Sequence, residues 1–495
     1  MNKKNVQGNQ KGGAHKIARA GEICGEGKRK ENFVRGRGGG GRGGGKNGPY
    51  GRQKKIFGCF VKRLLTNLRL RGYNGRKVRR LAQILWKYCG NHAETPQNSG
   101  AARGAPEAGA GTGMETGTRI YFDHAATTPL DREVFEKMRP YFTDVFGNAD
   151  SLHSFGREGM RAVDESRDLI ASLIGARPEE VYFTSGGTES DNWAILGAAR
   201  AQRKKGKPKV LISAVEHHAA ISAGERLEKE GIPVGRIPVN KEGRAEPETV
   251  RAMLTPEVGL VAVMAANNET GAVQPFRECA RLAHENGSLF FTDAVQAAPY
   301  LRIDVEDWGA DLLSFSAHKF YGPKGIGALY IRRGTGMERL ISGGEQERGL
   351  RGGTVNVPSV VGFAAAYEKT LRDLDKNNAK IRALKTLFLK EFFAEIPEAR
   401  INGGGESLPG ILNLRLPGVD NAAFLFNMDL HGVALSAGSA CAASSLKPSH
   451  VLTAMGLSEK EAGSSVRLSF GRDNTEEEIV RGAALAAEIC KKIRG

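Results

Sequence analysis

Short apolar runs alternate with longer amphipathic stretches from residue 119 onward, and this alternation constrains the fold more than any other feature of the chain. The apolar runs are too short for helices, and helical stretches such as 157–174 and 276–286 separate several of them. This pattern predicts an α/β fold with a mostly parallel sheet. The expected buried strands are 180–184, 210–213, 260–264, 289–292, 312–315 and 328–331.

The pattern changes after about residue 375, where two helices precede short strands near 410–416 and 466–470 and a closing helix from Thr475. A chain of 495 residues also exceeds what one hydrophobic core usually supports. We therefore expect a large domain over 134–375 and a smaller α+β domain built from 119–133 and 376–495. Residues 1–118 are expected to form a basic, Gly-rich, disordered extension.

The net charge separates this extension from the rest of the chain. Of the 72 Lys and Arg residues 25 lie within 1–113, but only 5 of the 55 Asp and Glu residues do, which leaves 47 basic and 50 acidic groups elsewhere. The Arg/Gly run 35–45 resembles tracts that bind RNA, so a nucleic-acid contact is predicted only through the extension. A role at RNA or at a membrane surface stays open. We favour the alternative of no dedicated role, and whether Met114 is the true start stays open. The shortage of serine argues against a transit peptide.

The cysteine pattern bears on the compartment of the protein. Six cysteines are scattered without a C-x-x-C pair, which predicts neither a disulfide framework nor a zinc site and fits a reducing cytoplasm. No apolar run reaches the roughly 18–20 residues that a membrane helix needs, so we expect no membrane partner.

Polar turns follow the expected strands, at the edge where an open parallel sheet binds ligands. The turn 185–192 places two glycines and Thr188 at the start of a helix, where N–H groups could hold a phosphate; simple helix capping is the alternative. His217 follows the strand 210–213 and could stack on a flat cofactor or be structural. The turn 267–271 supplies amide donors.

Two ionisable residues at strand ends indicate a cofactor. Asp293 ends a buried strand, and the protonated ring nitrogen of pyridoxal phosphate (PLP) is a suitable partner for its carboxylate; helix capping is the alternative. Lys319 follows the strand 312–315 and is placed to form a Schiff base with PLP, whereas Lys324 lies on a Gly/Pro turn and is expected to be solvated. In combination with Thr188, these residues predict a PLP site.

Two downstream residues complete the candidate set. Cys441 lies within 435–449, among residues too small to bury it, so an exposed nucleophilic thiol is predicted, although a lone cysteine is usually a buried apolar group. Arg467 falls in a strand-like run and suits bidentate capture of a substrate carboxylate, with a structural salt bridge as the alternative.

These residues, in this order, resemble the cysteine desulfurase family, the NifS/IscS-like members of the class-V aminotransferases. The resemblance covers 119–492 and omits the extension. The motifs that carry it are YFDHAATTP (121–129), GN (147–148), TSGGTESDN (184–192), EH (216–217), NNETG (267–271), DAVQ (293–296), SFSAHK (314–319), GGEQERG (343–349), RGGT (351–354), SAGSAC (436–441) and SVR (465–467).

The resemblance implies a PLP-dependent transferase of fold type I, acting as a homodimer. It implies that Lys319 forms the Schiff base, Asp293 pairs with the ring nitrogen, Gln296 contacts the ring hydroxyl, and His217 stacks on the ring and moves protons. The residues implied for the phosphate are Gly187, Thr188, Ser316, His318 and, toward the neighbouring subunit, Thr354. The residues implied for the substrate carboxylate are Asn148, Asn268 and Arg467, of which Asn268 is also implied in cofactor binding.

The implied reaction is a sulfurtransferase reaction that converts L-cysteine to L-alanine and leaves a persulfide on Cys441. The long loop around Cys441 resembles the class that passes sulfur directly to an iron–sulfur scaffold or to tRNA-thiolation enzymes. No resident metal is expected, although Cys441 could contact a nascent iron–sulfur cluster. The alternatives that stay open are a lyase acting on selenocysteine, a supplier dedicated to tRNA thiolation, and an RNA-associated protein whose PLP domain is incidental.

Overall fold

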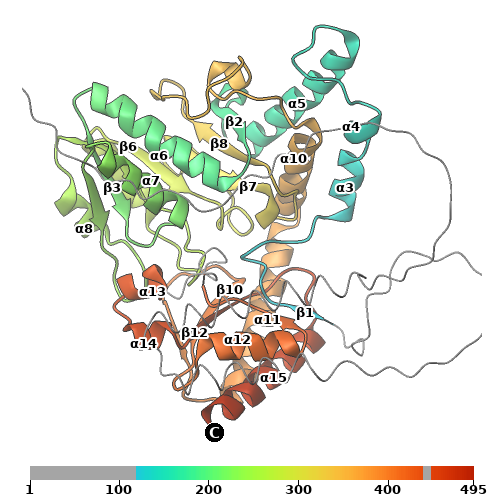
Figure 1. Cartoon of the computed structure of the whole chain (residues 1–495), viewed down its shortest axis with the longest axis vertical. Helices are drawn as coiled ribbons and strands as arrows, with labels where there is room; N and C mark the ends of the chain where they lie inside the picture. Colours follow the sequence, from blue (N-terminus) through green and yellow to red (C-terminus); the bar gives the residue numbers. More distant parts are fainter. Residues whose placement is uncertain (1–118, 439–447) are drawn as a thin grey trace, which may run out of the picture. The chain divides into compact units, whose positions relative to one another are not determined.

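A seven-stranded sheet forms the centre of the computed structural model, which describes residues 119–438 and 448–495. The strand order is β2-β8-β7-β6-β5-β3-β4. Figure 1 labels β2, β8, β7, β6 and β3 of this sheet. β8 pairs antiparallel with both neighbours, and all the other neighbouring strands pair parallel, so the carboxyl ends of six strands meet at one edge. The strands are β2 (Val181–Thr184), β3 (Lys209–Ser213), β4 (Val234–Ile237), β5 (Val258–Ala262), β6 (Leu289–Asp293), β7 (Leu312–Ser316) and β8 (Gly327–Ile331). The predicted mostly parallel α/β sheet is confirmed.

Helices cover both faces of this sheet, because its strands bury side chains on both sides. In β6, Phe290 and Phe291 are each 0% exposed, yet they belong to different apolar clusters, as alternation along a strand requires. The cluster of Phe291 includes α6 (Gly187–Lys204) and α7 (His218–Lys229). The cluster of Phe290 includes α5 (Ser154–Leu173), α9 (Phe276–Glu285) and α10 (Val357–Arg372). The shorter elements of this region are α3 (Arg132–Met138), α4 (Pro140–Thr143), α8 (Pro247–Met253), η1 (Pro178–Glu180), η2 (Ala317–Lys319) and η3 (Glu347–Gly349).

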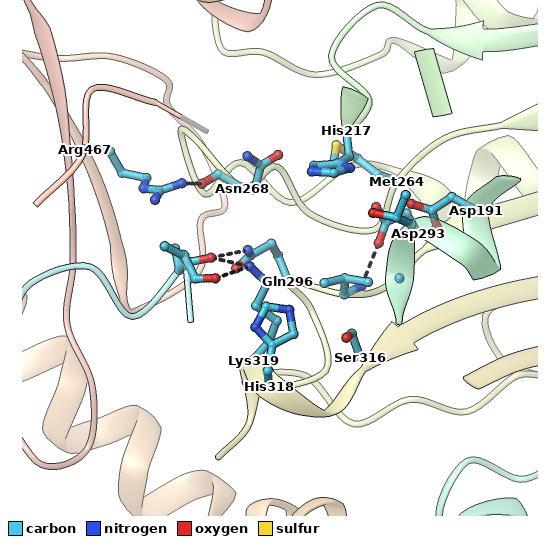
Figure 2. A pocket seen from close by; sticks show the side chains of 15 residues that line it. Asp191, His217, Met264, Asn268, Asp293, Gln296, Ser316, His318, Lys319 and Arg467 are labelled. Carbon is cyan, nitrogen blue, oxygen red and sulfur yellow. Dashed lines mark hydrogen bonds between the residues drawn. The ribbon is translucent and has the colours of Figure 1, made fainter. Parts of the chain in front are cut away.

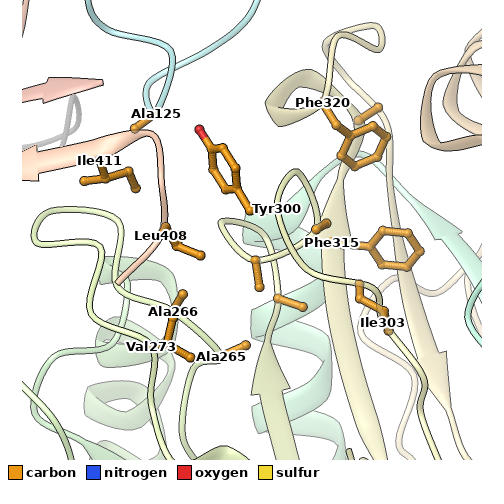
Figure 3. Packing of buried hydrophobic residues seen from close by; sticks show 14 of the residues in the cluster. Ala125, Ala265, Ala266, Val273, Tyr300, Ile303, Phe315, Phe320, Leu408 and Ile411 are labelled. Atoms are coloured by element: carbon orange, nitrogen blue, oxygen red, sulfur yellow. The ribbon is translucent and has the colours of Figure 1, made fainter. Parts of the chain in front are cut away.

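A smaller antiparallel sheet, β12-β10-β9, lies with the C-terminal helices in the lower part of Figure 1. β1 (Ile120–Tyr121) pairs parallel with β11 (Val433–Ala434) and so joins the start of the described chain to this region. The other elements here are β9 (Arg400–Ile401), β10 (Ile411–Arg415), β12 (Ser465–Ser469), α11 (Leu374–Glu395), α12 (Asn421–Leu430), α13 (His450–Ala454), α14 (Glu459–Ala462) and α15 (Glu476–Arg494). A single apolar cluster contains both Phe315 of β7 and Ile411 of β10 (Figure 3). The division of the chain at residues 133 and 375 stays a prediction.

In the central sheet, two strands differ from the expectation by more than one residue, and the two-residue strands β9 and β11 of the smaller region were also not expected. β5 begins at Val258 and ends at Ala262, two residues earlier than expected at each end. β4 was not anticipated, because it is an edge strand that pairs only with β3 and buries only Ile237 fully, which leaves a weak apolar pattern. Within the described ranges, no helix is long and apolar enough to span a membrane.

Candidate active site

A cavity of about 180 Å³ opens at the carboxyl ends of the parallel strands (Figure 2). Its walls come from the segments after β1, β2, β3, β5, β6 and β7 and from β12 of the smaller sheet. Ten residues singled out in the sequence line it: Gly187, Thr188, His217, Asn268, Asp293, Gln296, Ser316, His318, Lys319 and Arg467. The turns therefore converge on one site, as the position of strand ends in a parallel sheet leads one to expect.

One end of the cavity is suited to an anion. Gly186 is the N-cap residue of α6 and has no side chain to cap the helix, so the N–H groups of the first turn stay available to an anion. The φ angle of Gly186 is 151°, a backbone conformation that favours glycine. A Cβ on Gly187 would lie 2.8 Å from Val295 Cγ2, so a side chain there would clash with another residue that lines the cavity. The helix dipole adds positive potential at the same point. This end can therefore hold a phosphate.

A buried carboxylate stands elsewhere in the cavity wall. Asp293 ends β6, and its Oδ1 accepts a hydrogen bond of 2.8 Å from the Val295 N–H. Burial raises the pKa of Asp293 to about 6, against the opposing effects of that hydrogen bond and of the Lys319 charge. A cationic ring nitrogen would stabilise the ionised form of this carboxylate.

Two further buried acids surround Asp293. Asp191 of α6 lines the cavity, and Ser314 Oγ donates a hydrogen bond of 2.5 Å to its Oδ1. Burial, and then the charge of Asp293, raise the pKa of Asp191 well above its usual value. Burial also raises the pKa of Glu216 to about 8, although the Met264 N–H donates to its Oε1 at 2.6 Å. Two of these three acids, Asp191 and Asp293, line the cavity, and burial makes their ionisation costly.

Lys319 brings its amine into the cavity from η2, directly after β7. Its Nζ donates hydrogen bonds to the carbonyl oxygens of Ala125, at 2.6 Å, and Ala126, at 2.8 Å. Gln296 Nε2 donates to the same Ala125 oxygen at 2.9 Å. Lys324, the competing lysine, is exposed and lies outside this cavity.

Both histidines of the cavity are neutral near pH 7. Burial and the nearby Lys319 charge lower the pKa of His217 to about 4 and that of His318 to about 4. His217 is the N-cap of α7, and its Nδ1 accepts a hydrogen bond from the Ala219 N–H, which leaves the proton on Nε2. His318 Nδ1 lies 3.1 Å from Thr127 Oγ1.

Arg467 is the most deeply buried cation of the site, with 1% of the residue exposed. Its Nη1 donates to the backbone oxygen of Asn268 at 3.0 Å, and its Nη2 lies 2.7 Å from Asp123 Oδ1. Asn148 and Thr354 are exposed and do not line the cavity of their own chain. Cys441 lies outside the described residues. Their roles stay predictions.

The cavity also contains residues that the sequence analysis did not assign. Besides Asp191 these are Ala125, Ala126, Met264 and Val295. Asp191 stands four residues after Gly187 on α6, a spacing that puts both on one helix face, and this signal could have revealed it. Within the described ranges, no group of three or more His, Cys, Asp and Glu side chains could hold a metal ion.

Comparisons with known proteins agree with this geometry. The family model described as "Aminotransferase class-V" matches residues 120–481. A cysteine desulfurase IscS from Clostridium botulinum is 43% identical over 379 residues, which are 76% of this chain and 95% of that protein. A solved structure titled "NIFS-LIKE PROTEIN" is 33% identical with a TM-score of 0.71, and the match covers 76% of this chain and 100% of that one. Another, titled "SspA in complex with cysteine", is 35% identical with a TM-score of 0.64 over 72% of this chain and 100% of that one.

Proposed function

The chain belongs to the class-V aminotransferase family and, within it, to the cysteine desulfurases, and from this membership we propose the role of each residue at the cavity. The family that the sequence motifs resemble is thereby confirmed. The enzyme is a sulfurtransferase that takes sulfur from L-cysteine and releases L-alanine. A similar protein was solved in complex with cysteine.

Enzymes of this family use PLP in general, and the chemistry of the cavity residues fits that group. The first turn of α6 can take its phosphate, Asp293 its ring nitrogen and Lys319 its aldehyde. When bound, PLP supplies an electron sink for the charge left at the substrate Cα. The residues that would hold its phosphate are Gly187, Thr188, Ser316 and His318. Gln296 would contact the ring hydroxyl, Asn268 would also contact the cofactor, and His217 would stack on the face of the ring.

The amino acid is bound through its carboxylate and activated at Cα. Arg467, with Asn268 beside it, supplies the donors for the carboxylate, because the guanidinium is buried and its fork matches two oxygens. Lys319 Nζ, held at the cavity wall, moves the proton of the substrate Cα. His217 is neutral and can take part in proton transfer at its ring.

Sulfur leaves the substrate on Cys441. Its thiolate attacks the substrate sulfur, the bond from that sulfur to Cβ breaks, and Cβ takes up a proton. One cysteine and one enzyme thiol thus give one alanine and one persulfide, with no external oxidant or reductant. The acceptors that fit this product are an iron–sulfur scaffold, where Cys441 could also contact a nascent cluster, or a tRNA-thiolation enzyme.

A homodimer is part of this proposal. Large apolar side chains along 142–155 face solvent: Phe142, Phe146, Leu152 and Phe155 are 58%, 67%, 91% and 52% exposed. A patch of this kind marks a protein interface. Thr354 is also exposed, which fits the prediction that it reaches the phosphate of a second subunit. A cytoplasmic location fits the two described cysteines, Cys279 and Cys490, which are buried free thiols.

The convergence of Lys319, Asp293 and the first turn of α6 on one cavity is the observation that carries the proposal. The test compares the full chain with Lys319→Ala and Cys441→Ala, using Lys324→Ala as the matched control. Cofactor absorption and the release of alanine and sulfide from cysteine are measured. Lys319→Ala is expected to lose covalently held cofactor and activity, and Cys441→Ala to lose sulfide release, while Lys324→Ala keeps both. Normal sulfide release by Cys441→Ala would refute the persulfide role.

A further inference from the structure

Asp123 joins the substrate end of the cavity to two distant segments of the chain. It follows β1, its Oδ1 lies 2.7 Å from Arg467 Nη2, and its Oδ2 accepts a hydrogen bond of 2.9 Å from Ser436 Oγ. Its side chain is 16% exposed, and that of Arg467 is 1% exposed. A buried guanidinium needs such a counter-ion, because a lone charge loses its hydration on burial.

Arg467 retains donors beyond this ion pair. A guanidinium has five N–H groups, and one bond to the Asn268 oxygen and one to Asp123 use two of them. Within the described residues Arg467 Nε has no hydrogen-bond partner, although it is buried. A second carboxylate can therefore bind the same guanidinium while Asp123 stays in place.

We propose that Asp123 is a positioning residue that sets how tightly the enzyme holds the carboxylate of its substrate and product. It fixes the orientation of the Arg467 guanidinium and neutralises part of its charge. The carboxylates of cysteine and alanine therefore bind with moderate affinity, and alanine can leave. The inference rests on the proposed role of Arg467 as the carboxylate site.

The consequence is an increase in carboxylate affinity when the charge of Asp123 is removed. Asp123→Asn keeps the shape of the side chain: its oxygen can accept from Arg467 Nη2, and its amide nitrogen, in the place of Oδ2, can donate to the Ser436 oxygen. An arriving carboxylate then no longer meets a second negative charge a few ångströms away. Even at the dielectric constant of bulk water, which gives the smallest repulsion, two charges about 4 Å apart change the affinity about fivefold, and the lower effective dielectric constant of a protein interior makes the change larger.

The experiment uses the holoenzyme and two probes that lack the amino group of cysteine. 3-Mercaptopropanoate carries the carboxylate, and 3-mercaptopropanamide is its uncharged amide. Competitive inhibition constants are measured together with the rise in melting temperature that each probe causes, since a ligand that binds the folded state raises that temperature. The expected result for Asp123→Asn is inhibition by 3-mercaptopropanoate about fivefold tighter, a larger melting shift with that probe, and no change with the amide.

Three controls make this result specific. Asp131→Asn removes another partly buried acid, which pairs with Lys369 and Arg472 outside the cavity, and should lower stability without changing either inhibition constant. Asp123→Glu keeps the charge and should stay within about twofold of wild type for the carboxylate probe. If Asp123→Asn does not fold, Ser436→Ala replaces it: Asp123 keeps its charge but loses a donor, so the carboxylate probe should bind about twofold more weakly, and unchanged or tighter binding would overturn the inference.

The outcomes separate this inference from the proposed function. Arg467→Lys should weaken inhibition by 3-mercaptopropanoate at least about tenfold; if it does not, the carboxylate site is elsewhere and both ideas fall. If Arg467→Lys has that effect but Asp123→Asn leaves the carboxylate probe unchanged or weaker, only the role of Asp123 is overturned. An equal gain in the affinity of Asp123→Asn for 3-mercaptopropanamide would also overturn it, because the charge of the probe would then not be the cause.

Discussion

Gly327, the first residue of β8, keeps the anion-binding turn in place because it has no side chain. A Cβ at this position would lie 2.8 Å from the Cα and the carbonyl carbon of Gly186 and 2.9 Å from the Phe315 oxygen. Ordinary contacts begin at 3.4 Å, so Gly327→Ala must displace backbone by about 0.6 Å. No rotamer can relieve this contact. Overpacking of this kind costs about 1–3 kcal/mol.

Part of this cost should appear in cofactor binding, since Gly186 is the N-cap of α6 and precedes Gly187 and Thr188. If about 1.4 kcal/mol is lost there, affinity for PLP falls about tenfold, and the melting temperature should fall by a few degrees. Titration of the apoenzyme with PLP and thermal denaturation measure the two effects. Gly336→Ala is the matched control, because its Cβ would have no neighbour closer than 3.6 Å. Equal PLP affinity and melting temperature in both variants would refute the reasoning.

Three further predictions concern the acids and the exposed patch. Asp293→Asn should slow loss of the Cα proton at least about 100-fold, as measured by deuterium exchange into L-alanine. Asp191→Asn should slow it much less, because burial and the charge of Asp293 raise the pKa of Asp191 and disfavour its ionised form. Equal losses in the two variants would contradict this. The pKa of Glu216 is raised to about 8, so between about pH 4.5 and 8 this group binds a proton in the folded state but not in the unfolded state, and the free energy of unfolding falls as pH rises through this window. Glu216→Gln should remove that loss in denaturant titrations at pH 5 to 9. An unchanged dependence of the free energy of unfolding on pH would contradict this. Phe146→Ser with Leu152→Ser should shift the chain toward a monomer in light scattering, and an unchanged mass would exclude this patch as the interface.

Local sequence carries much of the architecture and of the candidate site. Buried strands such as β6 and β7 are recognisable because their apolar runs are short and end in polar turns. Asp293 and Lys319 were predictable for the same reason, since the ends of parallel strands meet at one edge of a sheet. The edge strand β4 was not predictable, because a strand with one buried residue has little apolar signal.

By itself, the sequence determined the α/β class, the family and the polar turns that line the cavity. Only the tertiary structure decided which distant groups meet there: Lys319 bonds carbonyl oxygens nearly 200 residues away, and Arg467 pairs with Asp123 across 344 positions. It also placed Asp191 beside the cavity and left Asn148 exposed outside it. The physical reason is that apolar periodicity and turn chemistry are local properties, whereas burial, ion pairing and shifted pKa values depend on packing between segments remote in the chain.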